Sequence, residues 1–174
     1  MGERIVLTGG CGSGKSAYAL DLARRAAGCT ERVFIATATP FDDEMTQKIE
    51  RHREERGDDF KTVEEPLRLA ETLAEFAGSP HCCAVVDCLT VWMCNIAREK
   101  ESEKMKDDFA RVFESFSGVV IAVTNETGMG IVPPEKQTRE YAANLSELNR
   151  RIVSLSDRAC LLVSGQPLQI KPPA

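Results

Sequence analysis

Short apolar runs alternate with longer amphipathic segments along this chain. Five of the runs are mostly apolar on both faces, which is typical of strands buried in a parallel sheet. Between them, apolar positions recur with the spacing of helices. This alternation predicts an α/β fold, a mostly parallel sheet flanked by helices. The predicted strands span Arg4 to Thr8, Arg32 to Thr37, Cys82 to Asp87, Val119 to Thr124 and Ala159 to Ser164.

Helix limits follow from turn-forming residues. One helix is predicted from Lys15 to about Ala27, before Gly28, and another from near Pro66 to Gly78, because glycine commonly ends helices. Two apolar stripes predict further helices. They consist of Met105, Phe109, Val112, Phe113 and Phe116, and of Tyr141, Leu145, Leu148, Ile152 and Leu155.

The composition fits one globular domain spanning residues 1–174. Hydrophobic residues make up 43% and charged residues 28% of the chain. No internal repeat and no Pro/Gly/Ser-rich linker divides it. The charged stretch from Arg98 to Asp108 is interpreted as a solvated connection between helices.

Charge and cysteine usage exclude several kinds of partner. With 22 Lys plus Arg against 27 Asp plus Glu, the net charge of -5 provides no basic field for a nucleic acid. The apolar runs are too short to span a membrane and no signal-peptide pattern occurs, so we expect a cytoplasmic location. Seven cysteines without CxxC spacing do not indicate zinc, and most should be buried thiols in a reducing cytoplasm.

A glycine-rich segment between the first predicted strand and helix fits the phosphate-binding pattern GxxxxGK[ST], known as a P-loop. Glycines let backbone N–H groups surround phosphate oxygens, and the helix N-terminus adds positive potential. Lys15 would reach the outer phosphates, and Ser16 offers a hydroxyl to Mg²⁺. The alternative is a glycine-rich turn with an incidental lysine. The segment consists of Gly9, Gly10, Cys11, Gly12, Ser13, Gly14, Lys15 and Ser16.

A P-loop usually works with a carboxylate at the end of a neighbouring strand, which orders the metal ion through water. Asp87 closes a predicted strand and is the candidate for this role. The alternative is that Asp87 caps the helix that follows.

A mostly polar helix is predicted from Pro40 to about Arg56, with Thr39 as its N-cap. Its few apolar positions fall on one line with His52, which has arginines beside it. A lone helical histidine is by default a core or surface residue. However, a neutral imidazole is also a nucleophile toward phosphorus, and arginines would stabilise the transferring group. His81 is most simply a loop residue, to which we assign no role.

Five segments occur in the order that they have in one known family, and together they span nearly the whole chain. They are GGCGSGKS, IATATPFDDEMTQKIERHREERGDDFKTVEEP, VVDCLTVWMCN, VTNETGMGIVP and LLVSGQPLQIK. On these motifs the chain resembles the bifunctional adenosylcobinamide kinase / adenosylcobinamide-phosphate guanylyltransferase of cobalamin biosynthesis. The resemblance implies a RecA-like P-loop fold and an enzyme with two activities.

The resemblance also implies the reactions and the residues that carry them. The kinase would move the γ-phosphate of ATP or GTP to a hydroxyl of adenosylcobinamide. The guanylyltransferase would hold GMP from GTP on a histidine, matched here by His52, and pass it to adenosylcobinamide phosphate. Adenosyl-GDP-cobinamide and pyrophosphate are the products, and a closed homo-oligomer such as a trimer is implied.

By the same resemblance, nucleotide contacts extend beyond the P-loop to a strand end, to the segment after the histidine and to two acids. Ser16 and Asp87 would also hold Mg²⁺, and Lys15 joins His52 as a catalytic residue. Without the resemblance, Glu64 could equally be a helix N-terminal acid before Pro66. The further contacts are Ala36, Thr37, Ala38, Arg53, Glu54, Glu55, Arg56, Glu64 and Asp87.

A second glycine-rich segment, residues 125–134, follows the strand that ends at Thr124. Ligands of α/β proteins bind at the carboxyl edge of the sheet, and Met129 offers an adaptable apolar surface for a corrin ring. The alternative is a surface loop with a Gly-x-Gly turn. The following helix departs from the family, which usually has Arg-Asp, Gly and Asn-Gln there. This sequence has Ala142-Ala143, Ser146 and Asn149-Arg150, so substrate detail or assembly could differ.

Two other functions are weighed against the bifunctional enzyme. The altered helix could leave a guanylyltransferase with weak or absent kinase activity. A nucleotide-dependent switch is a different class of protein, in which GTP orders a loop rather than reacting. The sequence shows neither an Asn-Lys-x-Asp motif nor a switch threonine with a DxxG element, which argues against a switch.

Overall fold

The computed structural model describes residues 2–39 and 57–172 of the chain. Within these residues, seven strands form one sheet in the order β3-β2-β4-β5-β1-β6-β7. Neighbouring strands are parallel except β6 and β7, which pair antiparallel. The strands are β1 (Glu3–Gly9), β2 (Glu31–Ala36), β3 (Lys61–Glu64), β4 (Cys82–Asp87), β5 (Val119–Val123), β6 (Arg158–Val163) and β7 (Gln166–Lys171).

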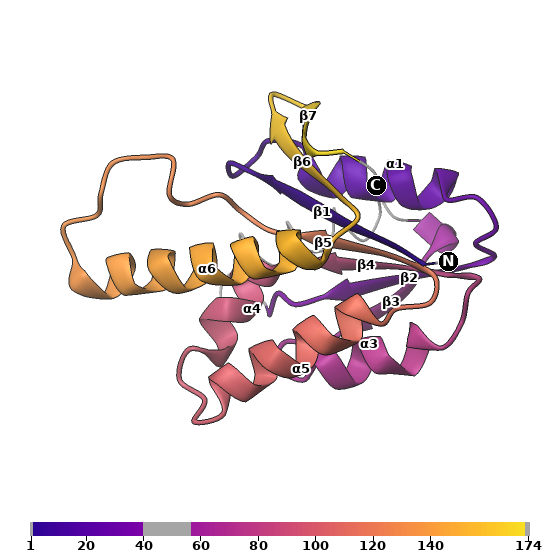
Figure 1. Ribbon diagram of the computed structural model, residues 1–174, viewed down its shortest axis with the longest axis horizontal. Helices are drawn as coiled ribbons and strands as arrows, with labels where there is room; N and C mark the ends of the chain where they lie inside the picture. The colour runs from indigo at the N-terminus through magenta and orange to yellow at the C-terminus, as the bar shows by residue number, and fades with distance from the viewer. Residues whose placement is uncertain (1, 40–56, 173–174) are drawn as a thin grey trace.

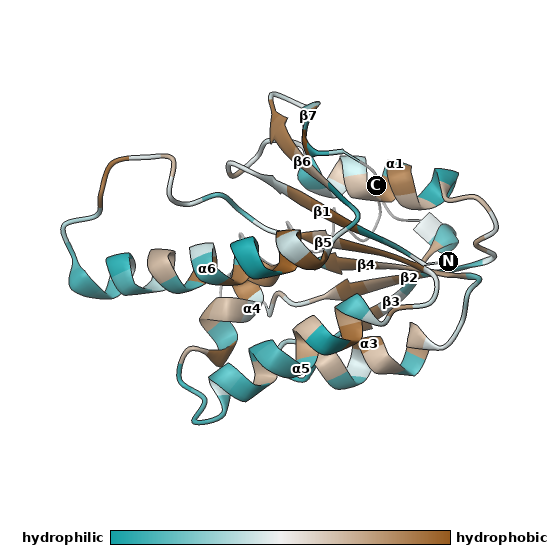
Figure 2. Cartoon of the chain, viewed as in Figure 1, coloured by the Kyte–Doolittle hydropathy of each residue, from teal (hydrophilic) through white to brown (hydrophobic). Residues whose placement is uncertain are grey.

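Helices cover both faces of the sheet (Figure 1). One face packs on α1, and the other on α3, α4, α5 and α6 (Figure 1). The central strands β2, β4, β5 and β1 are mostly apolar, whereas the helices alternate apolar and polar residues (Figure 2). This three-layer arrangement confirms the predicted α/β class. The helices are α1 (Lys15–Arg25), α3 (Leu69–Ala77), α4 (Leu89–Ile96), α5 (Ser102–Glu114) and α6 (Lys136–Leu155), with a 3-10 turn η1 at Gly57–Asp59.

Alternation along each buried strand supplies two separate cores. In β1, Leu7 packs on the α1 side with Leu20 of α1, whereas Val6 packs on the other side. Trp92 of α4 and Phe109 of α5 meet in the second core with their ring centroids 5.4 Å apart. Both rings are fully buried. The larger of the two cores lies between the sheet and α3 to α6.

The five predicted strands are confirmed to within a residue or two at their ends. The first helix ends at Arg25, and the helix placed near Pro66 begins at Leu69. The predicted helix from Pro40 to Arg56 lies outside the described residues.

The interpretation of Arg98 to Asp108 as a connection between helices was wrong for its second half, because α5 begins at Ser102. Although many residues of α5 are polar, one side of this helix is buried. Met105 packs against the core, and Lys106 is only 8% exposed, with its ammonium 2.6 Å from Glu103. A charged residue with a long apolar stem therefore continues the helix's buried face.

Strands β3 and β7 were not predicted. β3 is four residues long with mixed polarity, and β7 is an exposed edge strand that contains Pro167. Proline is tolerated at a sheet edge, but in a sequence it argues against a strand. Both strands form because a neighbouring strand offers them a pairing edge.

A chelated ion pair joins β1 to the start of β6. Arg4 donates from Nε and Nη2 to the two carboxylate oxygens of Asp157, at 2.8 and 2.7 Å. The Arg4 backbone N–H also donates to this carboxylate. These hydrogen bonds from Arg4 lower the pKa of Asp157 below its usual value. A depressed folded-state pKa stabilises the protein above the unfolded pKa, and this contribution is lost as the pH falls through the folded pKa.

We expect Asp157→Asn to lower the free energy of unfolding at pH 7 by about 1 kcal/mol, since it removes a partly exposed charged acceptor. The difference from wild type should shrink as the pH falls below about 4, where the carboxylate in the unfolded chain begins to protonate, and be lost below the lower folded-state pKa. Urea unfolding at a series of pH values measures both effects. Asp21→Asn is the control, because Asp21 pairs with Arg25 on an exposed helix face and should show no measurable change.

Candidate active site

The carboxyl ends of the six parallel strands meet at one edge of the sheet, and the pairing register aligns the last residues of β2, β3, β4 and β5. Ala36 pairs with both Glu64 and Asp87, and Asp87 pairs with Val123 of β5. Val123 also pairs with Leu7 of β1, shortly before the P-loop. The strand-end residues predicted to contact nucleotide are therefore brought together in one row.

The P-loop turns sharply between β1 and α1. Gly12 and Gly14 have φ angles of 69° and 91°, in the left-handed region that favours glycine. Lys15 begins α1 and is buried. Its Nζ donates to the carbonyl oxygens of Gly9 and Gly10, at 3.1 and 2.6 Å. Backbone N–H groups and a lysine ammonium thus gather at one helix N-terminus, which is an anion-binding arrangement.

Burial lowers the pKa of the Lys15 ammonium below its usual value, and the negative charge of Asp87 opposes this shift. The two predicted site residues therefore interact across the strand ends. Ser16, in the first turn of α1, is half-buried.

The turn between β6 and β7 supports the P-loop from the side. Gly165 N–H donates to Ser13 O at 3.0 Å, and a Cβ at Gly14 would lie 3.2 Å from Gly165 Cα. Ser164 and Gly165 form this turn with φ angles of 52° and 78°, as in tight hairpins. The sequence analysis gave this turn no role, although a Ser-Gly pair is a turn signal.

The end of β2 is fixed by α4. Thr37 is fully buried, and its hydroxyl lies 2.8 Å from both the N and the O of Cys88. Asn95 Nδ2 donates to Thr37 O at 2.9 Å. Ala38 is half-buried next to these contacts. The segment from Ala36 to Ala38 is therefore held at the carboxyl edge.

Neighbouring residues, not Asp87 and Glu64, make the side-chain contacts at the starts of α4 and α3. Cys88, not Asp87, is the N-cap of α4, and its Sγ accepts from Val91 N. Glu65 Oε1 accepts from the N–H groups of two residues just before α3, at 2.9 and 2.8 Å. Glu64 is exposed at the end of β3. Asp87 and Glu64 thus lie at the strand ends beside these contacts.

Residues 125–135 leave the sheet after β5 and extend beyond it, together with the first turns of α6 (Figure 1). Met129 and Val132 are 74% and 75% exposed, and Ile131 is 95% exposed. Glu126 N–H donates to Gly9 O at 3.1 Å, so the segment begins against the P-loop. A Cβ at Gly128 would lie 3.7 Å from Ser146 Oγ, which places one of the departures from the family beside this segment.

The remaining predicted site residues, His52, Arg53, Glu54, Glu55 and Arg56, lie outside the described residues. The described residues contain no group of three or more His, Cys, Asp or Glu side chains that could hold a metal ion. Mg²⁺ bound through nucleotide phosphates needs only one or two protein ligands, so a hydroxyl at Ser16 and a carboxylate at Asp87 fit it.

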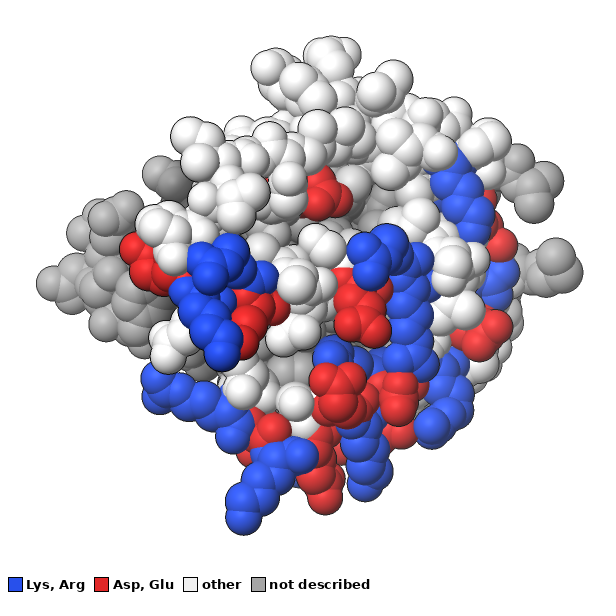
Figure 3. Space-filling model, turned by 60° about the vertical axis from the view of Figure 1, so that its left-hand side comes forward, with Lys and Arg blue, Asp and Glu red and all other residues white. Residues whose placement is uncertain are grey.

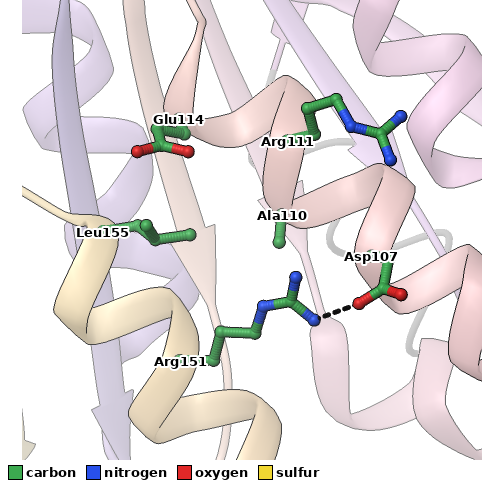
Figure 4. A pocket seen from close by; sticks show the side chains of 6 residues that line it. All are labelled: Asp107, Ala110, Arg111, Glu114, Arg151 and Leu155. Atoms are coloured by element: carbon green, nitrogen blue, oxygen red, sulfur yellow. Dashed lines mark hydrogen bonds and ion pairs between the residues drawn. The ribbon is translucent and has the colours of Figure 1, made fainter.

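A hollow of ≈ 380 Å³ lies between α5 and α6 (Figure 4). Arg151 Nη1 donates to Asp107 Oδ1 across it at 2.5 Å, and this bond lowers the pKa of Asp107. Leu155 lies just before β6 begins, at the amino edge of the sheet, so the hollow lies away from the P-loop. On the face shown in Figure 3, acidic and basic side chains are interspersed, so no single sign of charge covers it.

Sequence comparison identifies the family. The pattern of the family described as cobinamide kinase / cobinamide phosphate guanyltransferase matches residues 5–170. The chain belongs to this family. The prediction of an enzyme of this class is therefore confirmed.

Two relatives match this chain along nearly their whole length. The bifunctional adenosylcobalamin biosynthesis protein CobP of Pseudomonas aeruginosa is 34% identical, over 97% of each chain. The bifunctional adenosylcobalamin biosynthesis protein CobU of Escherichia coli is 30% identical, over 96% of this chain and 99% of its own.

Solved structures confirm the RecA-like P-loop fold. An ATPase from the type III secretion system of pathogenic bacteria matches with a TM-score of 0.63 at 14% identity, over 94% of this chain and 51% of its own. The flagellar accessory protein FlaH of Methanocaldococcus jannaschii matches with a TM-score of 0.54 at 12% identity, over 97% of this chain and 78% of its own. No helix among the described residues of the family member is long and apolar enough to cross a membrane.

Two adjacent glycines of the P-loop offer a matched test of the site's geometry. At Gly9, φ is 147° and a Cβ would lie 2.5 Å from Leu162 O, whereas a Cβ at Gly10 would meet nothing within 4 Å. We expect Gly9→Ala to lower the free energy of unfolding by at least about 2 kcal/mol, because backbone strain and a clash combine. Gly10→Ala should leave it nearly unchanged. Urea unfolding without nucleotide measures both variants, and equal losses would contradict the close packing of β1 on β6.

Proposed function

We propose that this enzyme phosphorylates adenosylcobinamide with ATP or GTP, and then transfers GMP from GTP through a guanylylated His52 to adenosylcobinamide phosphate. The products of the second reaction are adenosyl-GDP-cobinamide and pyrophosphate. The observation that carries the proposal is the P-loop with a buried Lys15 and Asp87 at one sheet edge, in a member of the cobinamide kinase / guanyltransferase family.

In the kinase step, P-loop N–H groups hold the nucleotide phosphates, and Lys15 turns from the Gly9 and Gly10 carbonyls to the outer phosphate oxygens. The substrate hydroxyl oxygen attacks the γ-phosphorus, and the bond to the bridging oxygen of the nucleoside diphosphate breaks. The hydroxyl proton is released to water as the new ester bond forms. The positive charge of Lys15 stabilises the charge that develops on the leaving oxygen.

In the guanylyl step, the neutral imidazole of His52 attacks the α-phosphorus of GTP and displaces pyrophosphate. Arg53 and Arg56 stabilise the charge on the departing group, with Glu54 and Glu55 contacting the nucleotide from the same segment. A phosphate oxygen of the corrinoid then attacks the guanylyl group and frees the imidazole. In the sequence this segment lies between β2 and β3, and both strands end in the row of site residues.

The strand ends would bind the remainder of the nucleotide. Ala36, Thr37 and Ala38 present backbone groups that α4 holds in place. The exposed carboxylate of Glu64 can accept hydrogen bonds from guanine N–H groups or ribose hydroxyls. Ser16 and Asp87 would hold Mg²⁺, which supplies positive charge to the phosphates when it is bound.

The corrinoid would pack on residues 125–134, whose exposed Met129, Ile131 and Val132 offer apolar surface near the P-loop. We further propose a closed homo-oligomer such as a trimer, working in a reducing cytoplasm. Four of the seven cysteines are buried, and burial raises the pKa of Cys82 and Cys83 to about 12, which keeps these thiols protonated.

The histidine intermediate is tested with Mg²⁺ and GTP labelled at the α-phosphate. We expect label on the denatured wild-type protein, in an acid-labile and base-stable bond as for a phosphoramidate. His52→Ala should take up no label. His81→Ala is the matched control and should be labelled like wild type, because His81 is exposed in a loop.

Two results would contradict this mechanism. Label that persists on the His52 variant would mean that another residue is the nucleophile. An unlabelled wild type that still binds GTP would favour a kinase or a nucleotide-dependent switch.

A guanylyltransferase without kinase activity is the second candidate function, favoured by the unusual Ser146 beside Gly128. Supplying GTP with either cobinamide or cobinamide phosphate separates the two. We expect both to yield GDP-cobinamide, detected by mass spectrometry, because the P-loop is complete. Product from cobinamide phosphate alone would establish the second candidate.

A further inference from the structure

Helix α6 holds residues 125–134, here called the glycine loop, at both ends. At the first end, Asn149 Nδ2 donates to Asn125 O at 3.0 Å. At the other end, Arg139 Nη1 donates to the carbonyl oxygens of Pro133 and Pro134, at 2.9 and 2.5 Å. One helix therefore fixes both ends of the segment that extends beyond the sheet.

The Asn149 amide uses both of its polar atoms. While Nδ2 donates to Asn125 O, Oδ1 accepts from Thr124 Oγ1 at 2.7 Å. Asn149 is only 6% exposed, so neither bond is readily replaced by water. Thr90 Oγ1 completes the attachment by accepting from Asn125 N at 2.7 Å. Because an amide alone combines this donor and acceptor, a carboxylate of the same shape cannot replace it.

The attachment also reaches the nucleotide site. The next residue, Glu126, donates its N–H to Gly9 O, the carbonyl oxygen that also accepts from Lys15 Nζ. Beyond this point, the described hydrogen bond of the central residues is a local one, from Gly128 N to Glu126 Oε1. The apolar tip at Met129, Ile131 and Val132 is thus positioned mainly from the two ends of the loop.

We propose that Asn149 and Arg139 are positioning residues that fix the glycine loop beside the P-loop and thereby set the affinity for the corrinoid substrate. This inference rests on the proposed function, in which the corrinoid packs on the loop tip. The P-loop keeps its own support from Gly165 N–H and from the Lys15 contacts. Loss of either positioning residue therefore weakens corrinoid binding much more than the reaction of the enzyme with GTP.

The test compares Asn149→Asp with Asn144→Asp, the same chemical change at an exposed position of the same helix. Two quantities are measured, the KM for cobinamide phosphate and the rate of protein labelling by GTP in the absence of corrinoid. Asn149→Asp should raise the KM at least about tenfold, because the half-buried carbonyl of Asn125 loses its donor and faces a carboxylate. The labelling rate should stay within about twofold of wild type, and Asn144→Asp should match wild type in both quantities.

Arg139→Ala provides a second test at an exposed position, where folding is not at risk. It should raise the KM for cobinamide phosphate several-fold and leave the labelling rate unchanged. Circular dichroism measures whether each variant is folded. If Asn149→Asp is unfolded, the KM of Arg139→Ala for cobinamide phosphate tests the inference.

The inference is overturned if folded variants keep the wild-type KM for cobinamide phosphate. It is also overturned if the KM rises and the labelling rate falls together, because that result means general damage to the P-loop. Failure of the proposed function has a different signature, which is the absence of label on the wild-type enzyme.

Discussion

The carbonyl group of Gly9 joins three parts of the active site at a point where no side chain fits. Its oxygen accepts from Lys15 Nζ and from the N–H of Glu126, and a Cβ on this residue would lie 2.5 Å from Leu162 O. The P-loop lysine, the start of the glycine loop and strand β6 therefore depend on one small residue. The parallel register then brings Asp87 and Ala36 to the same edge, so the proposed phosphate, metal and nucleoside contacts are placed by backbone pairing.

Much of this arrangement could be predicted from the sequence, because it depends on local patterns. Buried parallel strands are apolar on both faces, so five of the strands were recognisable from short windows. The P-loop has a fixed spacing between β1 and α1, and Lys15 was correctly placed at its end. Family motifs added residues whose chemistry alone left alternatives open, such as Glu64.

Contacts between distant segments could not be predicted in this way. β3 and β7 have little apolar content of their own and form because an adjacent strand pairs with them. Capping was only an alternative role for Asp87 and Glu64, yet their neighbours Cys88 and Glu65 make the contacts at these helix starts. One position along a chain hardly changes a pattern but decides which side chain reaches a backbone N–H group. Asn149 lies in a helix of ordinary polarity, and only the fold shows that both its amide atoms meet the loop after β5.

The hydrogen bond from Gly165 to Ser13 has a consequence for how the protein is made. Ser13 emerges early from the ribosome, whereas the β6–β7 turn emerges only after all the described helices have been synthesised. A nascent chain that has reached the end of α6 contains the complete phosphate-binding sequence but lacks the strand and turn that hold its shape. The phosphate-binding loop therefore gains this support from β6 and its turn only late in synthesis.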